Sequence, residues 1–339
     1  MATMRAIAIE GGKGPAAAMY ISDICKPVPA PGEALVKIRA FGLNRMDLLQ
    51  REGLYPVLPP QAPKTMGVEF SGVIEEFGDE DASKVARFKS GDEVFGLAYG
   101  GAYAEYIVVS TRMLIHKPKE LSWEQAAGIP ETWITASQAL FFIGEFRQGQ
   151  SILWHAGASS VSIAGIQLAK AEGASAIYAT AGSPEKVQFL EEELGVTKAF
   201  NYKTENWAAR LQELTSGVDL IVDFIGAPYF QGNLDTAAKN GRIVLLGLMG
   251  GEKLADGVNI APLLFKMLRV EASGLRTRDL DYQEKLRDLL VEHALPKFCD
   301  GSFKVHIEKV FPFEDIVEAH QLLEGNQTKG KIICMLGPR

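Results

Sequence analysis

One run of small residues in this sequence could bind a phosphate group, His155-Ala156-Gly157-Ala158-Ser159-Ser160-Val161-Ser162. In a turn of this kind between a strand and a helix, free backbone N–H groups and the helix dipole both attract an anion. The turn departs from the G-x-G-x-x-G pattern, because Ser160 and Ser162 stand where glycines would let a pyrophosphate approach. A Cβ at either position would push the pyrophosphate away or reshape the turn. Tight strand–helix packing would require a similar turn, so the motif alone leaves both interpretations open. The candidate contacts are Gly157, Ser159, Ser160 and Val161.

The segment about 20 residues further along indicates which nucleotide would bind. Enzymes that use NADH normally carry Asp or Glu there, which binds the ribose 2′-hydroxyl. This chain has Thr180-Ala181-Gly182-Ser183 instead, and no acid before Glu185. The Ser183 hydroxyl, the N-terminus of the helix that Ser183-Pro184 would begin, and the Lys186 ammonium would suit a 2′-phosphate. The pattern therefore favours NADPH, with contacts from Gly182, Ser183 and Lys186, although a solvated helix charge would also explain Lys186.

Length and composition limit the class of protein. The 339 residues predict about two domains, and 47% hydrophobic with 23% charged residues is typical of globular proteins. The net charge of −7 gives no general attraction to nucleic acid or anionic lipid, so we expect neither as a partner. The three cysteines are far apart and odd in number, which excludes a disulfide framework and suits a reducing compartment. The first residues lack the apolar run of a secretory signal, and no run of about 18 apolar residues could span a membrane. We expect a cytoplasmic protein.

Hydrophobic periodicity divides the chain into a β-rich part and an α/β part. In the first 120 residues, Ala34–Ala40 alternates apolar and polar residues as a half-buried strand does, and Ser122 and Gln125 have the spacing of a capping box. The proline-rich segment Tyr55–Pro60 is predicted to be a loop. From about Gln150, strands alternate with helices, which predicts a parallel sheet with right-handed crossovers. The predicted strands of this part are Ser151–Ala156, Ala176–Thr180, Leu220–Ile225, Ile243–Leu246 and Val270–Leu275. A last helix, Glu314–Leu323, and a last strand, Lys331–Leu336, end the chain.

Several motifs, in the right order, resemble the quinone oxidoreductases of the medium-chain dehydrogenase/reductase superfamily. They are Leu43–Asp47, Gln50–Tyr55, Pro130–Ala136 and Gly330–Ile333. Three further segments, Ala181–Ser183, Phe200–Lys203 and Gly247–Gly251, are similar to the branch of these enzymes that a tumour suppressor induces. The resemblance runs nearly end to end. It implies an α/β fold in which a Rossmann-type doubly wound parallel sheet is inserted into a β-rich GroES-like catalytic domain. The catalytic domain would comprise residues 1–127 and 275–339, and the NADPH-binding domain residues 128–274.

The resemblance also bears on metal binding. Zinc-dependent alcohol dehydrogenases of the superfamily carry a catalytic Cys where this chain has Asn44, and Gly-His-Glu where it has Gly67-Val68-Glu69. Four cysteines for a structural zinc are also missing, and the five histidines are dispersed. Each histidine is better explained as a structural or surface residue. We expect an enzyme without a metal.

Hydride transfer to a quinone requires an oriented nicotinamide, a flat apolar slot and at most one hydrogen-bond donor. By resemblance, Tyr55 would steady the nicotinamide or donate to the forming oxyanion, though it could instead be a packing residue. Asn44 and Thr135 match positions that approach the nicotinamide and its ribose, and Asn44 could equally cap a turn. Asp47 is better explained as a helix-start residue than as a base. Further residues match the cofactor side, namely Tyr202 beside the adenosine phosphate, Ile225, and the segments with Leu248, Met249, Gly330 and Lys331.

The resulting prediction is a metal-free, NADPH-dependent reduction of quinones, with Tyr55 and Asn44 as the catalytic residues. One alternative keeps the same site and reduces an activated C=C bond, as enoyl or alkenal reductases do. Another is an NADPH-binding structural or regulatory protein with little turnover. The family pairs the last strand of its cofactor domain edge to edge, and Val270–Leu275 is the matching segment, so we expect a homodimer; a tetramer remains an alternative.

Overall fold

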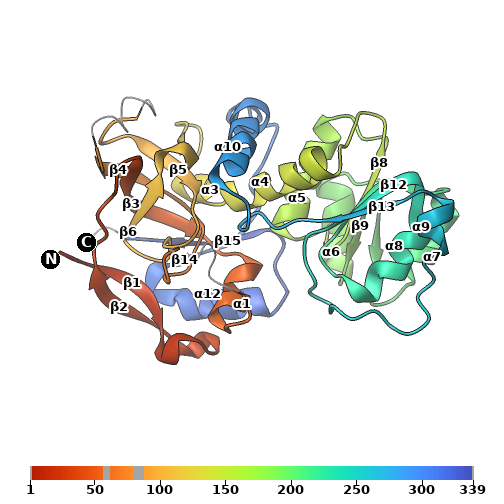
Figure 1. The fold of residues 1–339 in the computed structure, drawn as a ribbon, viewed down its shortest axis with the longest axis horizontal. Coiled ribbons are helices and arrows are strands. Elements are labelled where there is room, and N and C mark those ends of the chain that lie inside the picture. The colour runs from red at the N-terminus through yellow and green to blue at the C-terminus, as the bar shows by residue number, and fades with distance from the viewer. Residues whose placement is uncertain (1, 56–61, 80–87, 338–339) are drawn as a thin grey trace. The chain divides into compact units, whose positions relative to one another are not determined.

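The computed structural model describes residues 2–55, 62–79 and 88–337, which fold as two compact units (Figure 1). Unit 1 comprises Met1–Ile134 and Arg276–Arg339, and unit 2 comprises Thr135–Leu275. The boundaries predicted from the sequence fall after residues 127 and 274. The first observed boundary falls inside a continuous helix, α4 (Pro130–Ser137), so no turn residue marks it in the sequence.

Unit 1 contains a mostly antiparallel sheet with the strand order β14-β15-β3-β4-β5-β7, and β6 also pairs with β3. On β3 (Glu33–Gly42), Val36 and Ile38 are buried while Lys37 between them is exposed, as predicted, but Leu35 is also buried, so the alternation is incomplete. A separate antiparallel pair, β1 and β2, precedes this sheet. The remaining strands of the unit are β1 (Thr3–Ile9), β2 (Met19–Cys25), β4 (Glu69–Phe77), β5 (Glu93–Leu97), β6 (Tyr106–Ser110), β7 (Leu114–His116), β14 (Ile307–Pro312) and β15 (Lys331–Met335).

The capping box at Ser122 and Gln125 begins α3 (Trp123–Ala127), as predicted. The Ser122 hydroxyl accepts a hydrogen bond from the Gln125 N–H at 3.2 Å, and Gln125 Oε1 accepts one from the Ser122 N–H at 2.9 Å. Among the described residues, the unit also contains α1 (Arg45–Arg51), α10 (Leu280–Leu289), α11 (Leu295–Cys299) and α12 (Ile316–Glu324), and the start of α4. A π-helical turn, Leu290–Ala294, joins α10 to α11.

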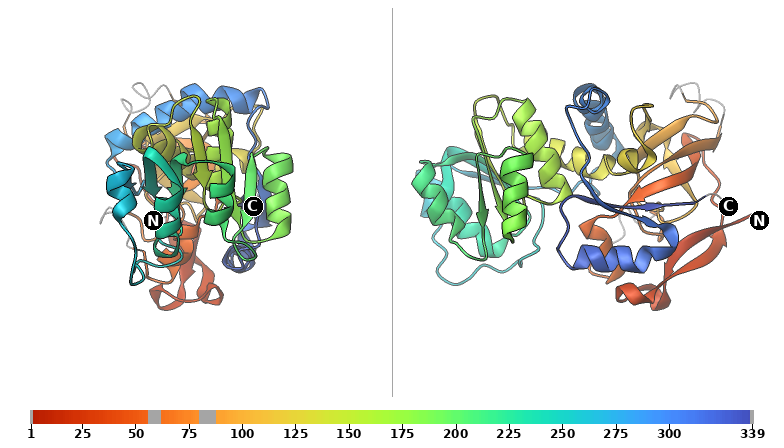
Figure 2. Two further views of the ribbon diagram at one scale, coloured as in Figure 1. Left: turned by 90° about the vertical axis from the view of Figure 1, so that its right-hand side faces the viewer. Right: turned by 180° about the vertical axis from the view of Figure 1, so that it is seen from behind.

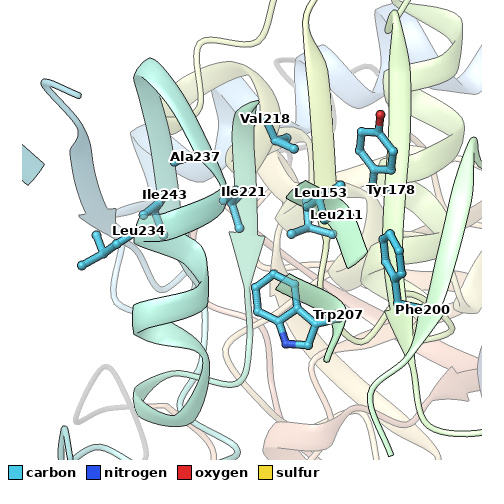
Figure 3. Close-up of a cluster of buried hydrophobic side chains, with 10 residues drawn as sticks. All are labelled: Leu153, Tyr178, Phe200, Trp207, Leu211, Val218, Ile221, Leu234, Ala237 and Ile243. Atoms are coloured by element: carbon cyan, nitrogen blue, oxygen red, sulfur yellow. The ribbon is translucent and has the colours of Figure 1, made fainter. Parts of the chain in front are cut away.

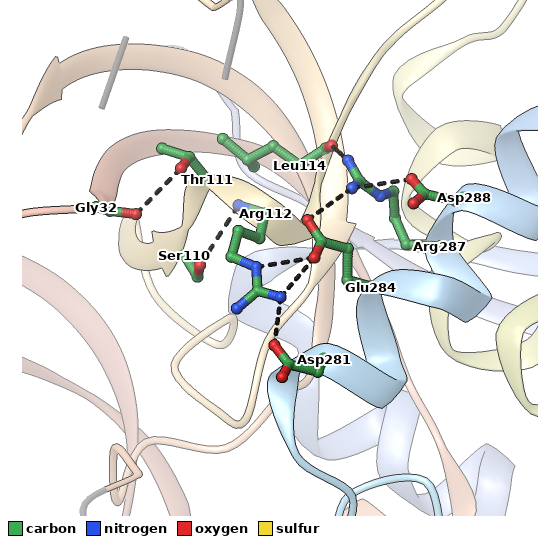
Figure 4. A network of polar contacts seen from close by, with 9 residues as sticks. All are labelled: Gly32, Ser110, Thr111, Arg112, Leu114, Asp281, Glu284, Arg287 and Asp288. Carbon is green, nitrogen blue, oxygen red and sulfur yellow. Dashed lines mark hydrogen bonds and ion pairs between the residues drawn. The ribbon is translucent and has the colours of Figure 1, made fainter. Parts of the chain in front are cut away.

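Ion pairs attach the returning C-terminal segment to the β-rich part of unit 1 (Figure 4). Arg112, in the 3-10 turn Thr111–Met113, donates to Asp281 at 2.6 Å and to Glu284, both on α10. Arg287, one turn further along α10, donates to the Leu114 carbonyl at 3.4 Å. The same C-terminal segment also supplies β15, which pairs with β3 in the sheet of unit 1.

Unit 2 is a six-stranded parallel sheet with the order β10-β9-β8-β11-β12-β13. Renumbered within the unit, this is the order 3-2-1-4-5-6 of the Rossmann fold, which confirms the predicted fold class. The strands are β8 (Ser151–Trp154), β9 (Ala176–Ala181), β10 (Lys198–Asn201), β11 (Val218–Asp223), β12 (Ala237–Leu245) and β13 (Arg269–Ala272). Strand β8 is shorter than predicted, because Ala156 has a left-handed backbone with φ of 48°. Strand β13 ends at Ala272 rather than Leu275.

Helices cover both faces of this sheet, and Figure 2 shows them from two further sides. On one face, Trp207 and Leu211 from α7 and Leu234 from α8 pack on strand residues such as Ile221 (Figure 3). On the other face, α5 lies directly on β8, since a Cβ added to Gly165 would come within 2.0 Å of the Trp154 ring. The helices of the unit are α5 (Ser160–Ala171), α6 (Pro184–Gln188), α7 (Trp207–Leu214), α8 (Phe230–Thr236) and α9 (Ala261–Phe265), with π-helical turns at Gln138–Ile143 and Phe189–Glu193.

Candidate active site

The phosphate-binding turn connects β8 to α5, and its serines form hydrogen bonds within the turn. Ser159 is the N-cap of α5, and its hydroxyl accepts from the Ser162 N–H at 3.3 Å. The Ser162 hydroxyl is fully buried and donates to the His155 carbonyl at 3.0 Å. The side chain of Ser162 therefore shapes the turn from inside, which was one of the two outcomes considered for this position. The first-turn N–H groups of Ser160 and Val161 have no acceptor within the helix and can bind an anion.

Gly157 is explained by packing at the carboxyl end of the sheet. Its N–H donates to the Thr180 carbonyl at 2.8 Å, and an added Cβ would lie 2.8 Å from the Ala179 Cβ and 3.0 Å from Leu190. The packing interpretation of this glycine is therefore supported. It does not compete with phosphate binding, because the free amides belong to the residues that follow.

The residues predicted to bind a 2′-phosphate lie together at the ends of β9 and β10. Ser183 is the N-cap of α6, and its hydroxyl accepts from the Lys186 N–H at 3.3 Å. The partly exposed Tyr202 ring lies over Gly182, since an added Cβ there would be 2.6 Å from the phenol oxygen. Ala181, Gly182 and Ser183 supply no carboxylate at the end of β9.

Apolar side chains gather after β11 and β12, where Ile225, Leu248 and Met249 were predicted to contact the cofactor. The Asp223 carboxylate accepts from the Ile225 N–H at 2.6 Å and so fixes the loop after β11. The Met249 N–H donates to the Phe224 carbonyl at 2.9 Å, which joins the two loops. Leu248 and Met249 are half exposed. These loops lie at the carboxyl ends of the strands, where Rossmann folds bind nucleotides near the switch point formed here by β8 and β11.

A buried hydrogen-bond network below these loops was not predicted from the sequence. His155 bonds Thr180 Oγ1 at 3.1 Å and Asn233 Oδ1 at 2.7 Å, and Asn233 Nδ2 donates to Asp223 Oδ2 at 2.8 Å. Burial lowers the pKa of His155, so the ring is neutral and structural, as expected for the histidines. The network joins the ends of β8, β9 and β11. Asp223, at the end of an apolar strand, was the one local signal for it.

In unit 1, Asn44 forms a buried cluster with Glu69 and Lys331. Asn44 Nδ2 donates to Glu69 Oε1 at 2.9 Å, Lys331 Nζ donates to Asn44 Oδ1 at 2.7 Å, and Lys331 forms an ion pair with Glu69. Lys331 is 1% exposed and Glu69 is 0% exposed. In the described parts of the chain, no group of three or more His, Cys, Asp or Glu side chains could hold a metal ion.

Gly330 and Lys331, which were predicted to contact the cofactor, also have structural roles. Gly330 has φ of 97°, and an added Cβ would lie 2.2 Å from the His306 carbonyl oxygen. The Lys331 ammonium is held by Asn44 and Glu69 as described above. Their contact with a cofactor stays a prediction.

Asp47 is a helix-start residue, as expected, and it leads to a second buried chain of polar groups. Its carboxylate accepts from the Asn44 N–H at 2.8 Å and from the Tyr103 hydroxyl at 2.9 Å. Burial raises the pKa of Asp47 to about 6. Tyr103 also contacts His320 Nε2 at 3.1 Å, while His320 Nδ1 accepts from Arg51 at 3.2 Å. Burial, with the nearby Arg51 charge, lowers the pKa of His320 to about 3, so this histidine is neutral.

Tyr55 lies beside two ionisable groups that were not predicted, Arg276 and Glu131. The guanidinium carbon of Arg276 is 5.8 Å from the centroid of the Tyr55 ring. Burial raises the pKa of Tyr55, and the Glu131 charge adds to the effect. Burial and the Glu69 charge raise the pKa of Glu131 to about 7. Glu131 lies in a motif of the resemblance, whereas nothing in the sequence singles out Arg276.

Thr135, the first residue of unit 2, carries a buried hydroxyl with no hydrogen-bond partner among the residues that the structure describes. This atom, the free amides of Ser160 and Val161 and the half-exposed Leu248 and Met249 fit a dinucleotide with an apolar, aromatic end.

Comparisons with known proteins agree with this geometry. Residues 30–119 match the alcohol dehydrogenase GroES-like domain, and residues 160–292 match the zinc-binding dehydrogenase domain. A quinone oxidoreductase of Pseudomonas aeruginosa is 33% identical over 310 residues, which cover 91% of this chain and 92% of the relative. The chain belongs to the medium-chain dehydrogenase/reductase superfamily. A human synaptic vesicle membrane protein VAT-1 homolog is also 30% identical over 325 residues, covering 92% of this superfamily member and 81% of that relative.

Solved structures of the superfamily are similar over nearly the whole chain. A quinone oxidoreductase of Pseudomonas syringae has a TM-score of 0.83 at 29% identity and covers 98% of this chain and 99% of its own. The JamJ enoyl reductase has a TM-score of 0.84 at 26% identity, with 99% and 100% covered. A mycobacterial protein solved with NADPH has a TM-score of 0.84 at 26% identity, with 98% and 100% covered. This member is therefore an oxidoreductase of the superfamily, and its fold is of the kind that binds a nicotinamide cofactor. The likeness to the inducible branch stays a prediction.

Among the described residues, no helix is both long enough and apolar enough to cross a bilayer.

Proposed function

We propose that this superfamily member reduces quinones with NADPH, without a metal in the reaction. The observation that carries the proposal is the Asn44–Glu69–Lys331 cluster. The Lys331 and Glu69 charges pair with each other, and the Asn44 amide bonds to both, so Asn44, at the position of the catalytic cysteine, is occupied by protein contacts. A substrate suited to this site must accept hydride without a Lewis acid, and an electron-poor quinone does so because its product oxyanion is delocalised.

Residues of unit 2 account for the cofactor in this proposal. The Ser183 hydroxyl and the Lys186 ammonium bind the 2′-phosphate, and the Tyr202 phenol lies beside it. The amides of Ser160 and Val161 bind the pyrophosphate. Bound NADPH supplies a hydride.

The other predicted contacts in unit 2 orient the reactive half of the cofactor. The Thr135 hydroxyl has no partner among the described residues and is therefore available to the cofactor. Ile225, Leu248 and Met249 provide an apolar wall. In unit 1, Asn44 keeps its position through Glu69 and Lys331, and Tyr55 donates to the substrate oxygen.

A substrate panel tests this proposal. Oxidation of NADPH and NADH is followed with 1,4-benzoquinone, 1,2-naphthoquinone and a 2-alkenal, each with and without a chelator. We expect turnover with the quinones, a preference for NADPH and no effect of the chelator. Loss of activity with the chelator would contradict the metal-free mechanism, and failure to bind either cofactor would contradict the dehydrogenase function itself.

A second candidate is reduction of an activated C=C bond at the same site. The similarity to an enoyl reductase structure supports it, and both reactions present a conjugated carbonyl to the hydride. Faster turnover of the 2-alkenal than of either quinone would favour this candidate. The third candidate, a structural or regulatory NADPH-binding protein, predicts tight cofactor binding without oxidation by any acceptor in the panel.

We further propose a homodimer formed by antiparallel pairing of β13 at the open edge of the unit 2 sheet. The strand is not the apolar segment predicted, because Arg269 and Glu271 are charged and exposed. Antiparallel pairing centred on Val270 would place Arg269 of each protomer opposite Glu271 of the other, which is favourable. Light scattering should show a dimer, and Val270→Pro should give a monomer, since proline cannot donate to the ladder. Unchanged mass would contradict this interface.

The proposal places the enzyme in the cytoplasm, where the free thiols of its three cysteines stay reduced.

A further inference from the structure

We propose that Arg276 binds the carbonyl oxygen of the hydride acceptor and stabilises the negative charge that develops on it. The inference rests on the proposed function, because it concerns the substrate of the same site. It gives the enzyme an electrophilic group in unit 1 that the sequence motifs do not contain.

Arg276 is only 6% exposed, yet its hydrogen bonds are made to neutral acceptors. Nε donates to the Tyr99 carbonyl at 3.0 Å, Nη1 donates to Gln50 Oε1 at 2.8 Å, and Nη2 also donates to the Tyr99 carbonyl. Within residues 2–55, 62–79 and 88–337, no carboxylate lies at ion-pair distance from this guanidinium. A guanidinium has five N–H donors, so these contacts leave donors for a ligand.

The other buried arginines of the described chain behave differently. Arg51 forms ion pairs with Glu52 and Glu324, and Arg242 forms one with Glu145. A buried charge without a partner is costly, because desolvation is not offset by attraction. Such groups are found preferentially at functional sites, where the ligand supplies the missing charge.

Two carboxyl groups offset the positive charge of Arg276, but neither is in direct contact with it. Asp47 and Glu131 act on it through space, but burial raises the pKa of Asp47 to about 6 and, with the Glu69 charge, that of Glu131 to about 7. Near neutral pH a substantial part of the Glu131 charge is therefore neutralised by protonation. The guanidinium stays charged and attracts an oxyanion.

Tyr55 marks the side from which a substrate would approach. The guanidinium lies 5.8 Å from the centroid of its ring, and the tyrosine is half-buried rather than enclosed. A flat acceptor beside the phenol would bring its carbonyl oxygen toward the guanidinium, which binds oxyanions strongly.

The electron balance of the step is simple. The quinone gains a hydride, that is two electrons and one proton, and becomes a hydroquinone monoanion, while the reduced nicotinamide is oxidised. A proton from water then completes the hydroquinone. Arg276 binds the anionic oxygen before that proton arrives, which is where a donor lowers the barrier.

The test uses the full-length protein and two kinds of measurement. Arg276→Gln should lower kcat with 1,4-benzoquinone by about a hundredfold, the usual effect of removing one oxyanion donor. The dissociation constant of NADPH should stay within about threefold, since the substitution lies outside the cofactor contacts. In a titration without cofactor, the wild-type protein should lower the apparent pKa of bound 4-nitrophenol by about one unit or more, and Arg276→Gln should not.

A nearby arginine and chemical rescue control for structural damage. Arg278→Gln, two residues away, should leave kcat, the melting temperature and the nitrophenol titration unchanged. Millimolar guanidinium should restore part of the kcat of Arg276→Ala. Retention of wild-type kcat and nitrophenol pKa in Arg276→Gln would overturn the inference. If the wild-type protein reduces no quinone, the proposed function fails, but the nitrophenol titration still decides whether Arg276 binds an oxyanion.

Discussion

Replacing Lys331 by Met should lower the free energy of unfolding of unit 1 by about 3–5 kcal/mol, the usual cost of leaving one member of a buried ion pair alone. The remaining partner, Glu69, is 0% exposed and would keep only the Asn44 amide and the Glu131 N–H, each at 2.9 Å. For a unit of about 200 residues, each kcal/mol moves the melting temperature by about 2–4 °C, so we expect a fall of roughly 6–20 °C.

A double-mutant cycle distinguishes the energy of the Glu69–Lys331 ion pair from the cost of lost packing around the Lys331 side chain. Glu69→Gln together with Lys331→Met leaves no unpaired charge, so the double variant should be at least about 1 kcal/mol more stable than the sum of the single effects predicts. Urea denaturation gives the free energies, and hydrogen exchange in β3 and β4 assigns them to unit 1. As a control, Lys198→Met removes an exposed pair with Glu191 and should cost no more than about 1 kcal/mol. Strict additivity in the cycle, or a cost for Lys331→Met as small as this control, would refute the reasoning.

Three further predictions concern pH, cofactor choice and the turn. Burial and the Glu69 charge raise the pKa of Glu131 from 4.5 to about 7, so the folded state holds this proton more tightly than the unfolded chain. The stability that this proton contributes is fully present below pH 4.5 and is lost as the pH rises to 7. In urea denaturation at a series of pH values, Glu131→Gln should therefore reduce the fall in the free energy of unfolding over this range, and should raise stability at pH 8 by at most about 3 kcal/mol. The same fall in wild type and variant would contradict the raised pKa. Lys186→Ala should raise the KM for NADPH at least about tenfold more than that for NADH, and equal effects would remove the 2′-phosphate assignment. Ser162→Gly removes the bond to the His155 carbonyl and should lower the melting temperature, at a cost of about 1 kcal/mol; a more stable variant would show that the turn prefers glycine.

The sequence by itself determined the local structure and the fold class. Some features depend only on residues that are close in the sequence, so they can be predicted without a structure. Examples are the capping box at Ser122, the helix start at Ser183-Pro184 and the alternation along β3. The strands and helices of unit 2 recur in a regular order, and connection rules leave few arrangements for such a chain. The residues predicted to bind phosphate groups in unit 2 follow β8 and β9, whose carboxyl ends are where Rossmann folds bind nucleotides. Thr135, which lies on α4, and the residues of the later loops were predicted from the family resemblance instead.

Only the tertiary structure decided which distant polar groups share a buried site. Asn44 meets Glu69 across 25 residues and Lys331 across 287, and no local pattern specifies these contacts. The same holds for Arg276, whose unpaired charge is visible only once its neighbours are known. The physical reason is that burial and charge compensation depend on residues from several elements at once, whereas caps and alternation depend on one stretch of backbone.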